Sequence, residues 1–232
     1  RQSLDAIHRP EKIAQAEGAR KRFAFEEMYA VQIVRAVERS RNESQPSFAM
    51  TDARHKTETF ITSLPFTPTH AQLRAISDIL GDFEKGHPMA RLLEGDVGSG
   101  KTIVAAATSY GVVTARPPGR TSGTLQVAYM APTEILAQQH FQSFIECFRD
   151  LPINIALITG SGCKKFPSKS VRGKATDISR SQLLKWVAGG EIAMIVGTHA
   201  LIQKSVKFKH LAYAIVDEQH RFGVEQRAAL RA

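Results

Sequence analysis

Several features that mark particular classes of protein are scarce or missing in this sequence of 232 residues. Its two cysteines, Cys147 and Cys163, belong to no C-x-x-C pair and lie beside no paired histidines, which argues against a zinc site and a disulfide framework. The longest mostly apolar run, Ile103 to Ala115, is interrupted by polar residues and is too short to span a bilayer. No segment has the layout of a signal peptide. We therefore expect a globular cytoplasmic protein with no membrane partner.

The charge balance is strongly basic. Lys and Arg number 31 against 22 Asp and Glu, which gives a formal net charge of +9 and a pI near 9.8. Such a surface binds phosphates without reading sequence, so a nucleic acid partner fits this composition. A surface of solvated lysines fits it equally well, and the composition leaves both interpretations open.

One stretch, residues 95–102, matches the pattern G-x-x-x-x-G-K-[ST] of a phosphate-binding loop at every fixed position. Its glycines permit a tight turn in which successive backbone N–H groups face phosphate oxygens. The ammonium group of Lys101 would approach the outer phosphates, and the hydroxyl of Thr102 would ligate Mg²⁺ at the start of a helix. The predicted nucleotide site comprises Gly95, Asp96, Val97, Gly98, Ser99, Gly100, Lys101 and Thr102.

Strand-like and helix-like segments alternate around this loop. The expected strands are 91–94, 126–131, 154–158, 192–196 and 213–216. The expected helices are 101–115, 133–148 and 180–188. Alternation of this kind predicts an α/β fold with a parallel sheet flanked by helices. Ligands of such sheets bind at the carboxyl ends of the strands, where the loop would lie.

The region before residue 65 has a different character. Residues 1–45 show apolar side chains at helical spacing, a polar stretch over 40–47 breaks that helix, and a second short helix is expected over 52–63. The apolar face of the first helix must pack on a partner. We predict a helical linker or extension over 1–64 and a nucleotide-binding lobe over 65–232.

Two adjacent carboxylates follow the apolar run 212–216. Asp217 would complete the Mg²⁺ shell beside Thr102, and Glu218 would orient and polarise the attacking water. Alone, an Asp-Glu pair at a strand end is often a solvated turn. Together with the loop it predicts nucleotide hydrolysis, with Lys101, Asp217 and Glu218 as the catalytic residues.

A basic segment over 160–174 contains five Lys or Arg residues and no acid. It is either a mobile solvated loop or a phosphate-contacting one. His140 and His199 are more simply explained as structural histidines than as ligands or catalysts.

The order of the motifs resembles the first motor lobe of superfamily 2 helicases, and within them the RecG family of ATP-dependent helicases that remodel branched DNA. The resemblance rests on the segments 66–72, 95–102, 131–140, 196–203 and 216–227. It implies a RecA-like lobe, ATP and Mg²⁺ as cofactors, and branched junctions and forks as the DNA partner. It also implies a monomer associated with the bacterial nucleoid.

The resemblance assigns further roles to individual positions. Gln72 would recognise the adenine, and His220 would couple the nucleotide state to DNA. A DNA-facing edge, where backbone N–H groups and hydroxyls contact phosphates, would comprise Thr133, Glu134, Gly197, Thr198 and His199. The basic segment over 160–174 is longer than is usual in the family, which puts its role in doubt.

Two other functions stay open. The transcription-repair coupling factor has a similar motor, but Ser99, Gln219 and Ala200 favour the RecG family. The second lobe and the DNA-binding wedge domain of that family have no counterpart in these 232 residues, which begin at Arg1 and end fifteen positions after Asp217 (232 − 217). The fragment alone would therefore be a nucleotide-binding module with poor turnover. A metabolic phosphate-loop kinase is disfavoured by the residues 217–220 and by the basic charge.

Overall fold

The computed structural model describes residues 2–116, 123–168 and 173–218, and it divides the chain into two compact units, Arg1–Pro46 and Ser47–Ala232. This division lies closer to the N-terminus than the boundary predicted at 64/65. The reason is that α3 (Ala53–Thr62) packs along α5 (Lys101–Thr114) inside the second unit. The contact is close, because a Cβ on Gly111 would lie 3.0 Å from the carbonyl oxygen of Ala53.

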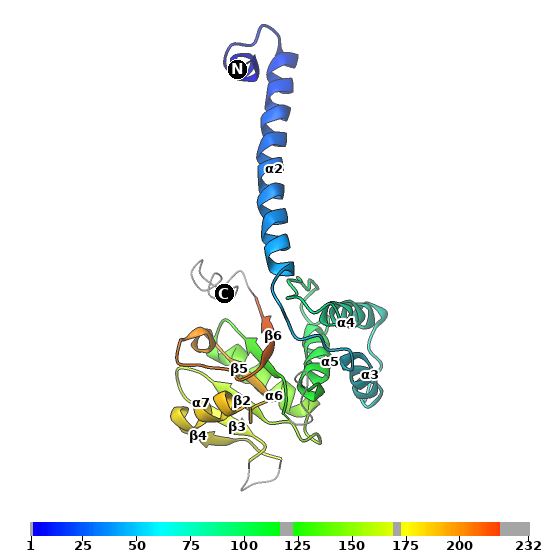
Figure 1. Ribbon diagram of the computed structural model, residues 1–232, viewed down its shortest axis with the longest axis vertical. Coiled ribbons are helices and arrows are strands. Elements are labelled where there is room, and N and C mark those ends of the chain that lie inside the picture. Colours follow the sequence, from blue (N-terminus) through cyan, green and yellow to red (C-terminus); the bar gives the residue numbers. More distant parts are fainter. Residues whose placement is uncertain (1, 117–122, 169–172, 219–232) are drawn as a thin grey trace. The chain divides into compact units, whose positions relative to one another are not determined.

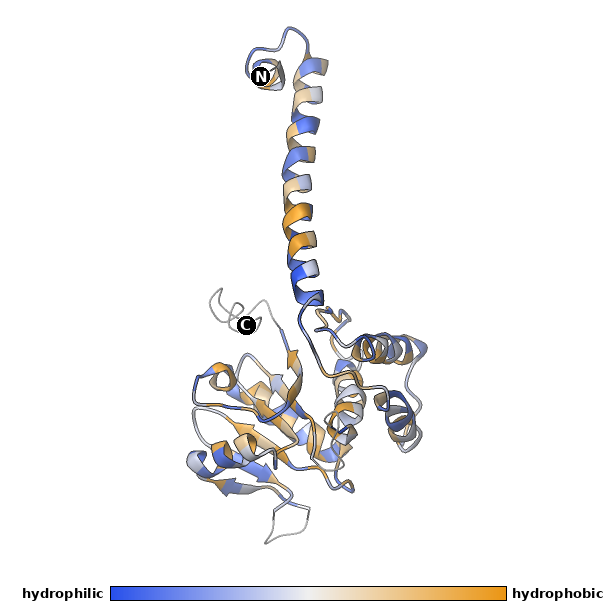
Figure 2. Cartoon of the chain, viewed as in Figure 1, coloured by the Kyte–Doolittle hydropathy of each residue, from blue (hydrophilic) through white to orange (hydrophobic). Residues whose placement is uncertain are grey.

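The first unit is a pair of helices, α1 (Gln2–His8) and α2 (Ile13–Glu43), with Pro10 between them. Arg22 links the two, since its guanidinium donates to the Ser3 hydroxyl at 3.1 Å and pairs with Glu26 at 2.8 Å. Apolar residues recur along α2, as the hydropathy colours in Figure 2 show, and many of them are exposed. Its large apolar side chains, between 41% and 80% exposed, are Ile13, Phe25, Met28, Tyr29, Val31, Ile33, Val34 and Val37.

In the described part of the second unit, six strands form one sheet in the order β4-β3-β2-β5-β1-β6 (Figure 1). The strands are β1 (Gln126–Met130), β2 (Ile155–Ile158), β3 (Cys163–Phe166), β4 (Thr176–Ile178), β5 (Met194–Gly197) and β6 (Leu211–Val216). The helices after α3 are α4 (His70–Phe83), α5, α6 (Glu134–Cys147), α7 (Arg180–Gly189) and the 3-10 helix η1 (His199–Ile202). The predicted α/β fold is confirmed.

The sheet is parallel only over β2, β5, β1 and β6; β3 and β4 add to it antiparallel. The predicted parallel sheet therefore forms the central four strands, and two antiparallel strands extend it. β3 comes from the basic segment, whose composition predicts a loop, and β4 follows directly after that segment. Lys164 lies opposite Asp177, and Lys165 is buried, with its ammonium group donating to Asn154 at 3.0 Å. A mobile loop is therefore wrong for residues 163–166, whereas phosphate contact by the basic segment stays a prediction.

Residues on alternate faces of each strand enter different cores. Val127, Tyr129 and Val196 belong to the larger core, which α3, α4, α5 and α6 cover, whereas Ala128 and Ile195 belong to the core beneath α7 and η1. This alternation follows from the two-residue period of a strand. Helices therefore cover both faces of the sheet, as predicted.

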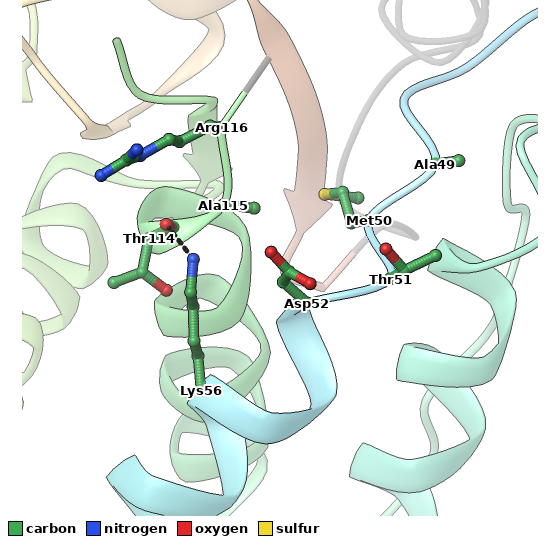
Figure 3. A pocket seen from close by; sticks show the side chains of 8 residues that line it. All are labelled: Ala49, Met50, Thr51, Asp52, Lys56, Thr114, Ala115 and Arg116. Carbon is green, nitrogen blue, oxygen red and sulfur yellow. Dashed lines mark hydrogen bonds between the residues drawn. The ribbon is translucent and has the colours of Figure 1, made fainter. Parts of the chain in front are cut away.

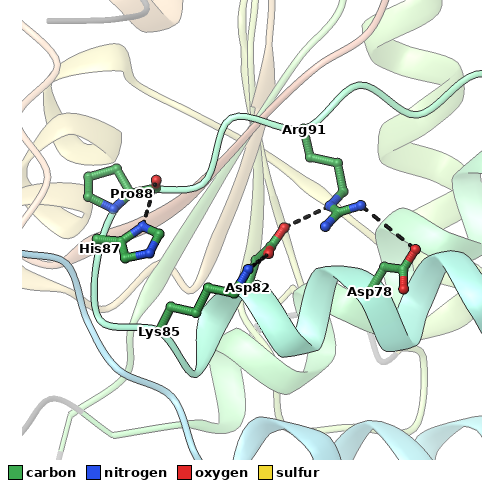
Figure 4. A network of polar contacts seen from close by, with 6 residues as sticks. All are labelled: Asp78, Asp82, Lys85, His87, Pro88 and Arg91. Atoms are coloured by element: carbon green, nitrogen blue, oxygen red, sulfur yellow. Dashed lines mark hydrogen bonds and ion pairs between the residues drawn. The ribbon is translucent and has the colours of Figure 1, made fainter. Parts of the chain in front are cut away.

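The predicted strand over 91–94 does not form. These residues have no regular secondary structure, and Leu92 is 71% exposed. Arg91 is held instead by α4, because its guanidinium contacts Asp82 at 2.7 Å and Asp78 at 3.7 Å (Figure 4). The chain that leads into residues 95–100 is therefore attached to a helix by ion pairs.

Candidate functional site

The strand register aligns the carboxyl ends of the parallel strands. Met130 of β1 lies opposite Gly197 of β5 and Val216 of β6, and Gly197 lies opposite Ile158 of β2. The connections that leave these four strands therefore begin side by side, as expected for an open α/β sheet. Every predicted residue from Thr133 onward that the structure describes lies at or just beyond these strand ends.

The predicted phosphate loop ends at Gly100, which caps α5 in the left-handed region with a φ of +79°. Gly98 has the same φ. Side chains other than glycine rarely adopt this conformation, so the two glycines give the loop its turn. Lys101 is the first residue of α5, and its ammonium group donates to the carbonyl oxygens of Gly95 at 2.6 Å and Asp96 at 2.9 Å. The charge is thereby held over the loop.

Gln72 is fixed against this loop by the start of α4. Its backbone N–H donates to the Thr69 hydroxyl, while its side-chain carbonyl accepts from the Thr69 backbone, which is a capping box. The side-chain Nε2 of Gln72 donates to the carbonyl oxygen of Ser99 at 2.8 Å. The same nitrogen lies against Gly100, where a Cβ atom would collide with it. The cap thus holds a side chain of α4 against the loop.

Asp217 lies just beyond β6, and its backbone N–H donates to the Met130 carbonyl oxygen at 2.8 Å. A hydrogen bond from His140 holds the pKa of its carboxyl below the ordinary value, and the charge of Lys101 acts in the same direction. The acid and the lysine are therefore close enough to interact electrostatically. The next residue, Glu218, has a φ of +47°, a left-handed conformation that is rare outside glycine and often found at functional sites.

His140 is the residue whose role the sequence reasoning missed. Its Nε2 lies 2.9 Å from the Asp217 carboxylate and 3.4 Å from the Tyr129 hydroxyl. We had taken it for a structural histidine. The sequence signal that could have found this residue is its spacing. His140 follows Thr133 by seven residues (140 − 133), or two helical turns, which keeps both residues on one side of α6.

The residues predicted to face DNA lie around the ends of β1, β2 and β5. Thr133 caps α6 by accepting from the Leu136 backbone at 3.3 Å. Glu134 accepts from the Gly160 backbone at 2.8 Å, and hydrogen bonds from Ser161 and Gly160 lower the pKa of its carboxyl. His199 adds to this lowering through its charge.

Close packing requires a glycine at position 197, which the sequence alone did not indicate. A Cβ there would lie 2.5 Å from the Ile158 carbonyl oxygen and 3.0 Å from Leu201, so only glycine fits. Thr198 beside it is buried, with an exposed fraction of 3%. Of the remaining predicted residues, Val97 is fully exposed, and His220 lies outside the described residues.

The donor set matches magnesium and phosphate chemistry. The oxygen atoms of Thr102 and Asp217 are the hard ligands that Mg²⁺ prefers. The loop backbone and Lys101 supply N–H groups and a positive charge. Within the described residues there is no cluster of three or more His, Cys, Asp or Glu side chains that could hold a metal by themselves. A site of this type binds the ion mainly through its substrate phosphates.

A separate pocket of about 250 Å³ lies between the start of α3 and the end of α5 (Figure 3). Lys56 fills part of it and donates to the Thr114 carbonyl oxygen at 2.6 Å, which caps the end of α5. None of the predicted nucleotide or DNA residues lines this pocket, so it is no part of the candidate site.

Comparison with known proteins identifies this arrangement. The model of the DEAD/DEAH box helicase family matches residues 69–232. The chain belongs to this helicase family. The resemblance to superfamily 2 motors is therefore confirmed.

Several helicases of one kind share extended similarity with the chain. It is 42% identical to the ATP-dependent DNA helicase RecG of Bacillus subtilis, over 99% of this chain and 31% of that protein. It is 49% identical to RecG of Aquifex aeolicus, over 73% of this chain and 19% of that protein. The chain thus spans less than a third of either relative.

A solved structure of RecG bound to a three-way DNA junction matches this helicase chain with a TM-score of 0.77. The two are 36% identical, and the match covers 95% of this chain and 27% of that one. The resemblance to RecG is therefore confirmed in both sequence and fold. Among the described residues of the helicase chain, no helix is long and apolar enough to cross a membrane.

Proposed function

We propose that residues 65–232 form the ATP-binding motor lobe of an ATP-dependent DNA helicase that remodels branched DNA in recombination and repair, and that residues 1–64 form its helical linker. The observation that carries the proposal is the glycine turn of the phosphate loop at the start of α5, with the ammonium group of Lys101 held over the loop carbonyls. The family match and the similarity to RecG give this nucleotide site its context.

In this proposal the nucleotide lies along the phosphate loop. Gln72 approaches the adenine from α4, and Lys101 leaves its loop carbonyls to contact the outer phosphates. Thr102 and Asp217 hold Mg²⁺, which neutralises charge on the transferred phosphate when it is bound. Glu218 orients and polarises the attacking water. His220 couples the nucleotide state to DNA.

DNA would bind along the ends of β1, β2 and β5. Thr133 and His199 are exposed there and offer polar groups to phosphates without reading bases, whereas the buried Gly197 and Thr198 would hold the turn between them. Glu134 cannot attract a phosphate, because its carboxylate is anionic; its bonds to residues 160 and 161 indicate that it shapes the edge instead. We propose branched DNA as the partner because one similar structure is described as RecG bound to a three-way junction.

The completed enzyme needs more than this lobe. Phosphoryl transfer by motors of this kind uses an arginine that stabilises the transition state, and we assign that arginine to a second lobe outside these 232 residues. This lobe alone would bind ATP and hydrolyse it poorly. We further propose a cytoplasmic, nucleoid-associated monomer, as the RecG resemblance implies.

The test measures ATP hydrolysis by the full-length protein with a three-way or four-way junction, with linear duplex, and without DNA. We expect the junction to stimulate hydrolysis most. Lys101→Ala should lower hydrolysis by at least about 10²-fold, since it removes charge stabilisation of the transferred phosphate.

Each other outcome has a distinct meaning. Equal stimulation by junction and linear duplex would favour a translocase of the transcription-repair coupling type. Turnover that depends on nucleotide but not on DNA would contradict the helicase proposal and revive a kinase-like function. A Lys101→Ala variant as active as the wild type would exclude the proposed nucleotide site itself.

A further inference from the structure

We propose that His140 is a positioning residue that orients Asp217 for the metal–nucleotide complex. The inference rests on the proposed function, since it takes Asp217 as a ligand of the Mg²⁺ that accompanies ATP. It adds a residue of α6, which neither the motif pattern nor the resemblance assigns to the nucleotide site.

The direction of the hydrogen bond follows from the acid. An aspartate carboxyl group is ionised at neutral pH, and a carboxylate can only accept a hydrogen bond. The Nε2 atom of His140 must therefore carry the proton and donate across the 2.9 Å that separates it from Oδ2. The histidine thus holds the Oδ2 atom, and the backbone N–H of Glu218 donates to the same carboxylate.

The ring is held in this orientation by packing. Its centroid lies 4.7 Å from that of Tyr129, whose hydroxyl approaches the same nitrogen at 3.4 Å. Tyr129 is 4% exposed and in turn packs edge-on against Phe144 at 5.1 Å. The histidine side chain itself is 15% exposed and that of Asp217 23%. The pair therefore stands at the margin of the core, shielded on one side and open on the other.

A held carboxylate suits the chemistry of the site. Asp217 is anchored at its backbone by Met130, but its side chain can still rotate about two torsions. A partner that donates to one oxygen of a metal ligand fixes its orientation, and loss of such a partner typically lowers metal affinity or activity by 10- to 100-fold. His140 has the geometry of such a partner. A histidine placed only to fill space would not need its Nε2 aimed at the acid.

Two amide variants of different reach separate positioning from packing. His140→Gln places an N–H donor close to where Nε2 lies, whereas His140→Asn carries the same amide on a chain too short to reach Asp217. We expect His140→Asn to weaken Mn²⁺ binding to the ADP complex of the full-length protein by about 10- to 100-fold. His140→Gln should stay within about threefold of the wild type, because it keeps the donor. The electron paramagnetic resonance signal of free Mn²⁺ measures the affinity directly.

Controls keep the outcomes distinct. ADP binding in EDTA should be equal in all variants, and Gln142→Ala, which removes an exposed side chain from the same helix, should bind Mn²⁺ like the wild type. Thermal unfolding checks that each variant folds, and His140→Ala serves as a second short side chain with the result expected of His140→Asn.

Two results would overturn the role of His140. One is unchanged Mn²⁺ affinity in His140→Asn. The other is an equal loss in the Gln and Asn variants, which would mean that the ring acts by packing against Tyr129. A different pair of results would contradict the nucleotide site of the proposed function. These are ADP binding by the wild type that does not respond to Mn²⁺, and ADP binding that Lys101→Ala leaves unchanged.

Discussion

The phosphate loop takes its turn, its lysine and its hydroxyl from the contiguous residues 95–102, whereas the acidic half of the site draws on β1, α6 and the end of β6. Residues 92 and 94–99, which lead into the loop and form most of it, are exposed. The ammonium group of Lys101 donates to carbonyl oxygens of the loop itself. Asp217 depends instead on Met130 and His140, which precede it by 87 (217 − 130) and 77 (217 − 140) residues. Local backbone chemistry forms the first half, and tertiary packing forms the second.

The largest effect should come from the core that supports the packed half. Phe144 is fully buried between Tyr129 and Phe148, so Phe144→Ala should lower the free energy of unfolding by about 3–5 kcal/mol. Denaturant unfolding of the full-length protein measures this. Phe66→Ala is the matched control, since its ring is 50% exposed and its loss should cost within about 0.5 kcal/mol. Similar losses in the two variants would mean that the acidic half does not rest on this core.

The loop half can be tested with two of its own glycines. Gly98 and Gly100 share a φ of +79°, so alanine at either position adds about 1–2 kcal/mol of backbone strain. Gly100→Ala should be worse, because its methyl group would displace the Gln72 amide, whereas nothing lies within 4 Å of the corresponding position at Gly98. The displaced hydrogen bond adds about 1 kcal/mol.

Unfolding free energies of the two variants, with ATP affinity alongside, measure that difference. We expect the weaker ATP binding in Gly100→Ala. If Gly98→Ala were the more damaging substitution, the contact between Gln72 and the loop would not be what makes position 100 the more sensitive one.

The smallest effect concerns the ion pairs that hold the lead-in to the loop. The hydrogen bond from Arg91 lowers the pKa of Asp82, with help from Lys85, so the folded protein binds this proton more weakly than the unfolded chain. Its contribution is therefore complete above the ordinary pKa of about 3.9 and is lost as the pH falls through the lower folded value. Asp82→Asn should cost about 0.5–1 kcal/mol at pH 7, because Arg91 is partly exposed.

A pH series of denaturant unfolding measures this contribution. The difference between wild type and Asp82→Asn should be constant from pH 8 to about pH 5 and should shrink only below about pH 4. The control is Asp78→Asn, whose carboxylate is 54% exposed and 3.7 Å from Arg91, and whose effect should be smaller still. A difference that already vanished near pH 6 would implicate another group.

The sequence by itself determined the features that short-range chemistry encodes. The glycine and lysine spacing of 95–102 fixed the loop, and hydrophobic periodicity fixed most of the helices and the four parallel strands. The caps at Thr69 and Thr133, which begin α4 and α6, are equally local, since each hydroxyl accepts from a backbone N–H three residues further on. Each of these depends on residues a few positions apart, so a linear pattern contains the information.

Only the tertiary structure decided how distant segments meet. Arg91 is held by α4 and its neighbours form no strand, and residues 163–166 join the sheet antiparallel although their composition indicated a loop. The link between His140 and Asp217 appears only when α6 packs on the sheet. Contacts of this kind depend on the register of strands and the docking of helices, which are set by burial over the whole core, so no local pattern records them.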